Sequence, residues 1–282
     1  MMRLCSLGVA LCLMSTAAWS SDARKEDYLE RMKVEHATDS PVASPAAQED
    51  PASNVESRDV DYADIGGSKI TGYLATPTEG NATAGIIVIH EWWGLNDNIR
   101  AMTRRFAGEG YAALAVDLYA GEVAETREDA LRLAKGSRDR TAELEQNLRS
   151  AWDYLEQKQG VAKVGVIGWC FGGGWSLRTD LLMGGDIDAT VIYYGNLVTS
   201  RKTLDTLESP VLGIFGALDQ GIPVATVREF QSVLDSLGKE ATVHIYEDAN
   251  HAFANPSGTR YNERAAQDAW GKTLNFLAHF LR

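Results

Sequence analysis

Cys170 is the residue whose type and setting most directly suggest covalent chemistry. It is the centre of Gly168-Trp169-Cys170-Phe171-Gly172, which follows an apolar run and precedes a helix-like stretch. A nucleophile at such a strand-to-helix corner is held in a strained turn, and the flanking glycines let neighbouring backbone pass close by. The start of a helix also favours thiolate over thiol. The pattern predicts a cysteine nucleophile, with the backbone N–H of Phe171 as an oxyanion donor.

Two alternatives for this stretch stay open. A lone cysteine in an apolar run is often only a small buried hydrophobe, and a glycine-rich strand-to-helix turn can instead cradle a phosphate. The stretch "GWCFGGGWS" has neither the G-x-G-x-x-G dinucleotide pattern nor the G-K-S/T ending of a nucleotide-triphosphate loop. The sequence therefore favours catalysis over phosphate binding.

A thiol nucleophile needs a base, and the sequence has five histidines. His251 follows the last predicted strand, in the loop "YEDANHAFANP", which is where this type of fold brings its base. The other four have weaker positions. His36 falls in a segment predicted to be flexible and His279 in the last helix, while His244 alternates within a strand and His90 ends one. We expect His251 to be the base.

The imidazole in turn needs a carboxylate that fixes its tautomer and stabilises its charged form. Asp219, in "GALDQGIP", follows the strand that precedes His251. The order Cys170, Asp219, His251 matches the chain order of nucleophile, acid and histidine that accompanies such a strand-to-helix elbow. Asp248 is the rival acid, but three residues from His251 it is better suited to shaping the loop.

The elements that must position these residues alternate along the chain. Five continuous apolar runs, at 84–90, 112–119, 163–169, 189–195 and 210–216, predict strands covered on both faces, and helix-like stretches lie between them. Two alternating runs at 59–65 and 69–77 predict an antiparallel hairpin. The fold class is therefore α/β, with a mostly parallel central sheet and helices on both faces. Sites in such sheets gather at the carboxyl ends of the strands.

The first 58 residues have a different composition. Residues 1–20 combine Arg3, a short apolar run and small residues, which predicts a signal peptide, although cleavage could fall as late as residue 23. Residues 21–58 are rich in Ala, Ser, Asp, Glu and Pro, which predicts a flexible segment, with a short helix over 24–36 as an option. Cys5 and Cys12 lie in the signal peptide, so Cys170 is the single thiol of the mature chain. We expect a periplasmic or secreted protein.

The formal net charge of −12 argues against nucleic acid or an anionic membrane surface as a partner. The apolar run near the N-terminus is too short for a stable membrane anchor. We expect a monomer that acts on a small molecule.

The motifs "HEWWGLNDNIR", "AVDLYAGE", "GWCFGGG", "IYYG", "GALDQGIP" and "EDANHAFAN" together resemble the dienelactone hydrolase family, from roughly Asp59 to the C-terminus. The resemblance implies an α/β-hydrolase fold for residues 59–282. It also implies a Cys-His-Asp hydrolase that cleaves an ester or lactone through an acyl-enzyme, without metal or organic cofactor. Two alternatives remain, an exported binding domain that has kept the fold without the chemistry, and an acyl transferase or thioesterase.

The resemblance also gives roles to two residues after the predicted strand at 84–90. Glu91 would manage the proton of the Cys170 thiol, and the backbone N–H of Trp92 would be the second oxyanion donor. Without the resemblance, Glu91 could equally cap a helix or pair with an arginine. We expect a largely neutral thiol at rest, with Glu91 or His251 taking its proton once substrate enters.

The sequence departs from the family at the expected substrate contacts. Members that cleave carboxylated dienelactones use arginines, one of them four residues beyond the catalytic histidine, where this chain has Asn255. Ala252 also follows His251 where a serine is common. Asn255 offers no charge-assisted contact to an anionic substrate. Four aromatic residues could line an apolar substrate pocket or serve only as packing: Trp92, Trp93, Tyr119 and Tyr194.

Overall fold

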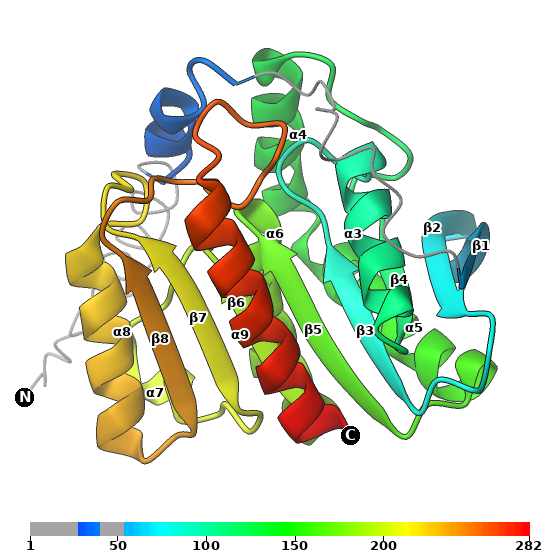
Figure 1. The fold of residues 1–282 in the computed structure, drawn as a ribbon. Helices are drawn as coiled ribbons and strands as arrows, with labels where there is room; N and C mark the ends of the chain where they lie inside the picture. Colours follow the sequence, from blue (N-terminus) through cyan, green and yellow to red (C-terminus); the bar gives the residue numbers. More distant parts are fainter. Residues whose placement is uncertain (1–27, 40–53) are drawn as a thin grey trace, which may run out of the picture.

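The fold is built on one eight-stranded sheet with helices on both faces (Figure 1). The computed structural model describes residues 28–39 and 54–282. The strands are β1 (Val55–Ile65), β2 (Ser68–Pro77), β3 (Ala84–Ile89), β4 (Ala112–Val116), β5 (Lys163–Trp169), β6 (Ala189–Tyr193), β7 (Val211–Gly216) and β8 (Ala241–Tyr246).

The sheet has the order β1-β2-β4-β3-β5-β6-β7-β8. β1 pairs with β2 and β2 with β4 in antiparallel fashion, and the remaining neighbours are parallel. The turn between β1 and β2 uses Gly66 and Gly67, whose φ angles of +61° and +83° suit glycine. The predicted hairpin and mostly parallel sheet are confirmed, and the architecture is that of an α/β-hydrolase.

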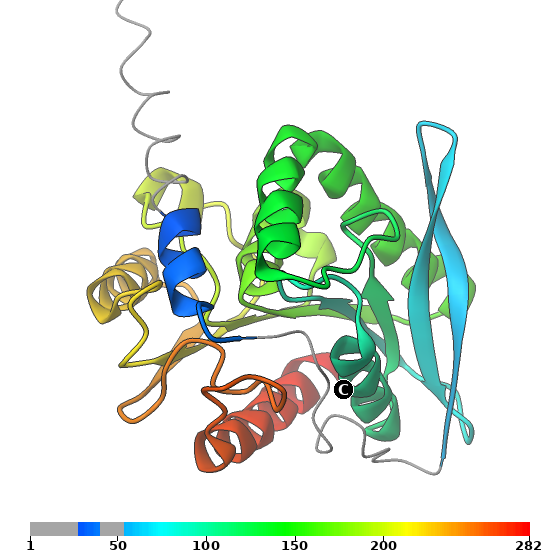
Figure 2. The same cartoon turned by 90° about the horizontal axis from the view of Figure 1, so that it is seen from above.

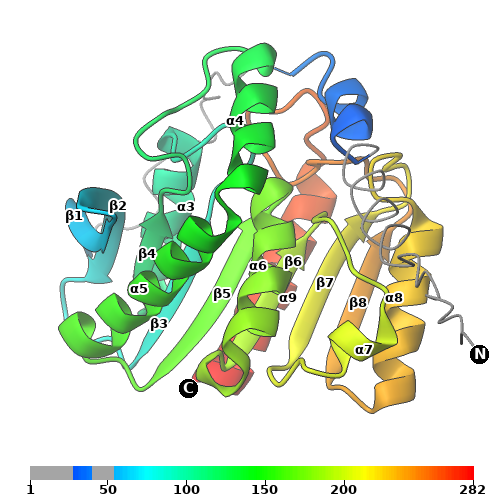
Figure 3. The same cartoon turned by 180° about the vertical axis from the view of Figure 1, so that it is seen from behind.

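Helices cover the two faces in separate groups. The helices are α3 (Asp97–Gly108), α4 (Arg127–Asp139), α5 (Thr141–Gln159), α6 (Phe171–Met183), α7 (Arg201–Leu204), α8 (Val224–Leu237) and α9 (Glu263–Leu281), with a 3-10 turn at Gly184–Asp186. α3 and α9 lie on the face toward the viewer in Figure 1, and α5 and α6 on the face seen in Figure 3. Each of these four helices packs on central strands of the sheet.

The central strands are buried on both faces. In β3, Ile86 and Val88 belong to the core cluster that includes α9, whereas Ile87 and Ile89 belong to the cluster that includes α5. All four side chains are fully buried. Burial on both faces is why this strand is a continuous apolar run instead of an alternating one.

Residues 28–39 form a segment that lies over the carboxyl ends of the strands, beside the loop that follows β8 (Figures 1 and 2). We call residues 28–39 the covering segment. It is helical over residues 28–35 and then turns. Tyr28, Leu29 and Met32 are buried in the same core cluster as α9, because their spacing puts them on one helical face.

The covering segment contains the short helix that was an option for residues 24–36, over residues 28–35, but its docking differs from the flexible stretch predicted for residues 21–58. That prediction rested on average composition, which is poor in large apolar residues, and it missed that the few present share one face. β1 also begins at Val55, before the predicted boundary at residue 59. The predicted signal peptide, residues 1–20, lies outside the described residues. Among residues 28–39 and 54–282, no helix is long and apolar enough to cross a membrane.

Candidate active site

The corner between β5 and α6 holds Cys170 in an unusual backbone conformation. Its φ of 54° and ψ of −113° lie outside the regions that ordinary side chains favour. Its N–H donates to the Tyr193 carbonyl at 3.0 Å, which fixes the corner against β6. A Cβ atom on Gly172 would lie 2.4 Å from the Ile89 carbonyl oxygen, so only glycine lets α6 start this close to β3. The sequence motif therefore does form a nucleophile elbow.

His251 and Asp219 meet beside this corner. Nδ1 of His251 lies 2.7 Å from Oδ2 of Asp219, and both side chains are fully buried. The other oxygen, Oδ1 of Asp219, accepts from the backbone N–H groups of Gly221 and Ile222, each at 2.8 Å. These bonds hold the carboxylate in one orientation, which in turn directs Nε2 of the imidazole away from it.

A second histidine, His36 of the covering segment, lies at the same thiol. Its Nε2 is 3.6 Å from Sγ of Cys170, and its Nδ1 is 2.7 Å from Oδ2 of Asp39. The ring is almost completely buried and stacks on Trp92 with ring centroids 4.3 Å apart. The sulfur and one nitrogen of each imidazole, His36 and His251, all lie within 4.8 Å of one another. The thiol is thus flanked by two imidazole–carboxylate pairs.

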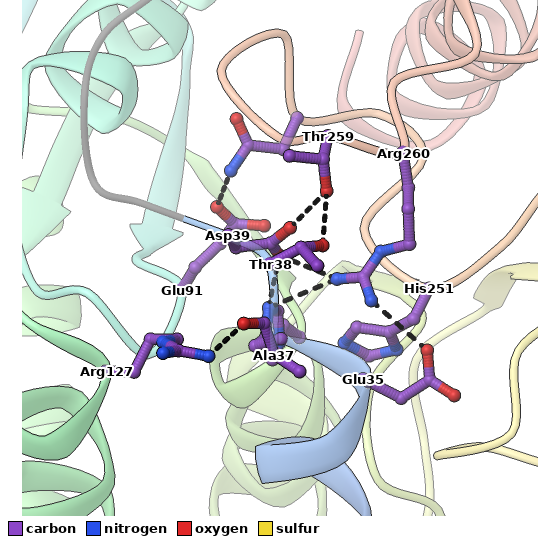
Figure 4. Close-up of polar contacts among 12 residues, drawn as sticks. Glu35, Ala37, Thr38, Asp39, Glu91, Arg127, His251, Thr259 and Arg260 are labelled. Atoms are coloured by element: carbon purple, nitrogen blue, oxygen red, sulfur yellow. Dashed lines mark hydrogen bonds and ion pairs between the residues drawn. The ribbon is translucent and has the colours of Figure 1, made fainter.

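Ion pairs from the loop after β8 hold the covering segment in place (Figure 4). Arg260 contacts Asp39 at 2.7 Å and Glu35 at 3.2 Å. The Thr259 hydroxyl donates to Oδ1 of Asp39 at 2.7 Å. Because Asp39 is bonded to His36, to Arg260 and to Thr259, its pKa falls to about 2 despite its burial, so it is ionised at neutral pH.

Electrostatics at the site favour the thiolate. Burial opposes ionisation of Cys170, but the neighbouring His251 and His36 lower the thiol pKa to about 6. Burial also disfavours the charged form of His251, yet the charges of Asp219 and Cys170 raise the pKa of that imidazole well above its usual value. Both shifts favour the thiolate–imidazolium pair. The sequence-based expectation of a neutral resting thiol did not count the second imidazole, and thiol reactivity against pH tests it.

Glu91 lies in the loop after β3 and is buried at the same site. Its Oε2 accepts from Nδ2 of Asn255 at 2.5 Å, while Oε1 is buried without a hydrogen-bond partner among the described residues. Burial and the negative charge of Cys170 raise the Glu91 pKa to about 8. This shift favours the protonated carboxyl at neutral pH. Asn255, which the sequence suggested as a substrate contact, is already engaged by Glu91 and by Asn98, whose Nδ2 is 3.4 Å from Oδ1 of Asn255.

The predicted aromatic residues surround the site. Trp92, Trp93, Tyr119 and Tyr194 are all buried, and the hydroxyls of both tyrosines have no hydrogen-bond partner in the described part of the chain. The Tyr194 ring lies 5.2 Å from that of His251 and the Tyr119 ring 5.2 Å from that of Phe171. Phe171 begins α6, so its N–H belongs to the first turn, where no partner exists within the helix.

Apart from His36, the residues weighed against the triad lie elsewhere. Asp248 is exposed and forms a two-pronged contact with Arg264 at 2.7 Å. His90 is buried between the Glu91 carbonyl and the Leu118 N–H. His244 is partly buried in β8 and His279 is exposed on α9. Of the four rival histidines, only His36 reaches the thiol.

His36 is the functional candidate that the sequence argument set aside. One signal could have pointed to it: three apolar residues on one face of a short helix, followed by a histidine and, three residues later, an aspartate. That pattern indicates a helix that docks and then presents an oriented imidazole. It does not say where, because the contact with Cys170 spans 134 residues.

The comparisons with known proteins agree with this geometry. Residues 70–281 match the model of the dienelactone hydrolase family. A protein of Saccharolobus solfataricus named as a carboxymethylenebutenolidase is 32% identical over 255 residues, covering 77% of this chain and 96% of its own. Protein usf of Aquifex pyrophilus is 32% identical over 222 residues, covering 76% and 95%. A crystal structure named as a dienelactone hydrolase from Klebsiella pneumoniae superposes with a TM-score of 0.71 at 26% identity, covering 80% and 99%. The chain therefore belongs to the dienelactone hydrolase family and is a carboxylic ester or lactone hydrolase.

Proposed function

We propose that the hydrolase works through a Cys-His-Asp triad and an acyl-enzyme. Cys170 attacks the substrate carbonyl as a thiolate, and the backbone N–H groups of Phe171 and Trp92 stabilise the oxyanion. His251 protonates the leaving group and then activates the water that cleaves the thioester, while Asp219 orients the imidazole. The observation that carries this proposal is the 2.7 Å contact of Asp219 with His251 beside the elbow cysteine.

The chain offers matched controls for a test of the triad. Asp219→Asn should lower kcat on small activated esters by on the order of 10³-fold or more, as loss of the orienting carboxylate does in serine triads. Asp248→Asn, on an exposed side chain of the neighbouring loop, should leave kcat within about twofold. His251→Gln should match the loss of Asp219→Asn or exceed it, with His244→Gln as its control. Equal activity of Asp219→Asn and Asp248→Asn would refute the assignment.

The acyl-enzyme needs its own evidence. Rapid quenching of the protein with an excess of a slow ester should give an intact mass raised by one acyl group, which maps to Cys170. Cys170→Ala should show neither the mass increase nor turnover. Turnover without any acylated protein under burst conditions would favour direct attack by water. Binding of esters without turnover would favour the non-catalytic alternative, and transfer to added thiols in preference to water would favour an acyl transferase.

We also propose that the apolar part of the substrate occupies a cavity of about 490 Å³ beside the elbow. Phe171, next to the nucleophile, and Tyr28 of the covering segment both line it. The rest of its apolar wall comes mainly from α6 and from the loop after β6, through Trp175, Leu177, Leu181, Leu182, Leu197 and Val198. Arg138, Arg178 and Glu145 also line the cavity, and Arg178 pairs with Glu145 at 2.6 Å. The apolar part of the wall suits an uncharged acyl chain. The replacement of the expected arginine by Asn255 points the same way.

Export from the cytoplasm is a further part of the proposal. It rests on the signal-like composition of residues 1–20. Mass spectrometry of the protein from its natural host should give a mature N-terminus between residues 21 and 24. Recovery of the chain with residues 1–20 intact and inside the cytoplasm would contradict it.

The remaining proposal concerns oligomeric state. The described surface exposes few large apolar side chains, namely Val34, Val123, Val198, Leu218 and Tyr261. Because these are scattered along the chain, we propose a monomer. Light scattering during size-exclusion chromatography should give the mass of one chain, and the mass of two chains would contradict the proposal.

A further inference from the structure

The covering segment completes a set of three ligand-type side chains that the triad alone does not have. His36, Cys170 and His251 are each at least nine-tenths buried, and their ligand atoms lie within 4.8 Å of one another. The two imidazole rings are nearly perpendicular, at 88°, with centroids 5.1 Å apart. The rings therefore meet edge to face and do not stack on each other.

The separations are close to those of a tetrahedral metal site. With Zn–S near 2.3 Å and Zn–N near 2.0–2.1 Å, tetrahedral ligands lie about 3.5 Å apart. The 3.6 Å between Nε2 of His36 and Sγ of Cys170 already has this value. The widest separation, at most 4.8 Å, would need side-chain movements of only about 1 Å to reach the tetrahedral value.

Each imidazole is oriented as a metal-bound imidazole usually is. Nδ1 of His36 lies 2.7 Å from Asp39, and Nδ1 of His251 lies 2.7 Å from Asp219. Metal-binding histidines commonly donate their second ring N–H to a carboxylate, which fixes the tautomer and leaves the other nitrogen free to coordinate. Nε2 of His251 is buried with no hydrogen-bond partner among the described residues. The two Nε2 atoms are therefore the ones available to an ion.

We infer that His36, Cys170 and His251 form a binding site for a thiophilic divalent metal ion of the Zn²⁺ class. One thiolate and two imidazoles suit Zn²⁺ or Cd²⁺, whereas Mg²⁺ and Ca²⁺ prefer oxygen ligands. The thiolate, Asp39 and Asp219 provide negative charge for a dication, which Arg260 partly offsets. Three protein ligands leave a fourth position for water.

An ion bound there holds the enzyme in a closed, inactive form. The metal occupies the sulfur lone pair that attacks the substrate and ties the covering segment to the elbow through His36. Bound sulfur is also shielded from oxidation, to which a free thiolate is susceptible. The inhibition rests on the proposed function, since it assumes that Cys170 is the nucleophile. The binding itself does not.

Co²⁺ titration of the metal-free, reduced protein tests the binding directly. We expect one equivalent of Co²⁺ with a sulfur-to-metal charge-transfer band and the strong visible bands of tetrahedral Co²⁺, all displaced by Zn²⁺. Cys170→Ser should lose the charge-transfer band. Asp39→Asn should weaken binding by about 10–100-fold, as loss of an outer-sphere partner does, and His36→Gln by at least as much. His244→Gln, in β8, is the matched control and should bind as the unaltered protein does.

Zinc-edge X-ray absorption on the unaltered protein gives an answer that does not depend on the folding of variants. One sulfur near 2.3 Å with two imidazole nitrogens is the expected shell. A zinc shell without sulfur, or His36→Gln with the same affinity and spectrum as the unaltered protein, would overturn the inference. Saturation that requires millimolar metal would overturn it as well.

Esterase assays with added Zn²⁺ separate this inference from the proposed function. Tight binding with full loss of turnover, reversed by chelator, supports both. If the protein binds Zn²⁺ tightly but the metal-free form has no esterase turnover, the metal site is supported and the proposed function is refuted. If saturating Zn²⁺ leaves turnover unchanged and Co²⁺ gives no sulfur-to-metal charge-transfer band, the metal site is refuted and the proposed function is not.

Discussion

Nε2 of His36 lies 3.6 Å from Sγ of Cys170, although the two residues are 134 positions apart in the chain. The contact makes the N-terminal segment part of the active site instead of a linker to it. It also gives the thiol a second imidazole whose orientation is set by its own carboxylate, Asp39. The behaviour of the thiol therefore depends on residues from distant parts of the chain.

The first prediction concerns the ionisation of the thiol. Because the Cys170 pKa is lowered to about 6, the iodoacetamide rate of the metal-free protein should rise with pH and reach half its plateau near pH 6. His36→Gln removes one of the groups that stabilise the thiolate, so its midpoint should move to higher pH. Rates normalised to their plateau separate this shift from any change in access. A midpoint near pH 9 in the unaltered protein would contradict the prediction.

Glu91 should show its raised pKa in protein stability. A carboxyl that is protonated when folded but ionised when unfolded costs folding free energy as pH rises from its ordinary pKa of 4.5 to its raised pKa of about 8. Glu91→Gln resembles the protonated form and has no such cost. Its melting temperature should therefore rise relative to that of the unaltered protein between pH 5 and pH 8. A constant difference in melting temperature over this interval would mean that the Glu91 pKa is not raised.

The same substitution tests whether Glu91 moves a proton during catalysis. If it does, Glu91→Gln should lower kcat by on the order of 10²-fold or more. The limb of the pH–rate profile near pH 8 should also disappear. If Glu91 only packs against Asn255, kcat should stay within a few-fold and the profile should keep its shape. Asn255→Asp is a useful companion, because it replaces the amide donor to Glu91 with a second carboxyl.

Loosening the covering segment should expose the thiol. Arg260→Gln removes the contacts to Asp39 and Glu35, and hydrogen bonds to charged groups contribute about 1.5–3 kcal/mol each. Alkylation of Cys170, measured at a pH where the thiolate is saturated, should become about tenfold faster or more. Arg264→Gln, which breaks only the exposed pair with Asp248, is the control. An unchanged rate in Arg260→Gln would show that these ion pairs do not limit access.

Narrowing the cavity beside the elbow should act selectively on substrates. Val198 is partly exposed at the cavity wall, so Val198→Trp should fold and fill part of the volume. We expect kcat/KM for a butyrate ester to fall about tenfold more than for the acetate, since a methylene in an apolar pocket changes kcat/KM by about 10–200-fold. Val123→Trp, at a separate cavity lined by Asp59 and Arg100, should leave the acetate-to-butyrate ratio unchanged. Equal losses for both esters would place the acyl chain elsewhere.

The sheet and the elbow could be predicted from the sequence because both leave local signals. Strands covered on two faces must be continuously apolar, as β3 and β5 are, and the turn into α6 requires glycines where backbones approach within contact distance. The pairing of Asp219 with His251 also followed from chain order, since the ends of β7 and β8 are neighbours in the sheet.

The covering segment left a local signal for its apolar helix face, but none for the place where it docks. The average composition of residues 21–58 hides a helix face that has only three apolar residues. The residues against which this face packs are distant in the sequence. Asn255 was misjudged for a related reason. Its type and position suggested a substrate contact, but its side chain donates a hydrogen bond to the buried carboxyl of Glu91. A contact between the loop after β3 and the loop after β8 produces no periodic pattern in the sequence from which it could be predicted.

The distant anchoring of the covering segment also sets the order in which the molecule can be assembled. Glu35 and Asp39 are 225 and 221 positions from Arg260, so the first part of the described chain to be synthesised is among the last to find its place. At about 5–20 residues per second, a ribosome needs roughly 10–45 s to make the partner after the segment itself. Until then Glu35 and Asp39 lack the arginine that holds the end of the covering segment. The covering segment can therefore be fixed over the thiol by these contacts only after β8 and the loop that follows it have been made and have folded.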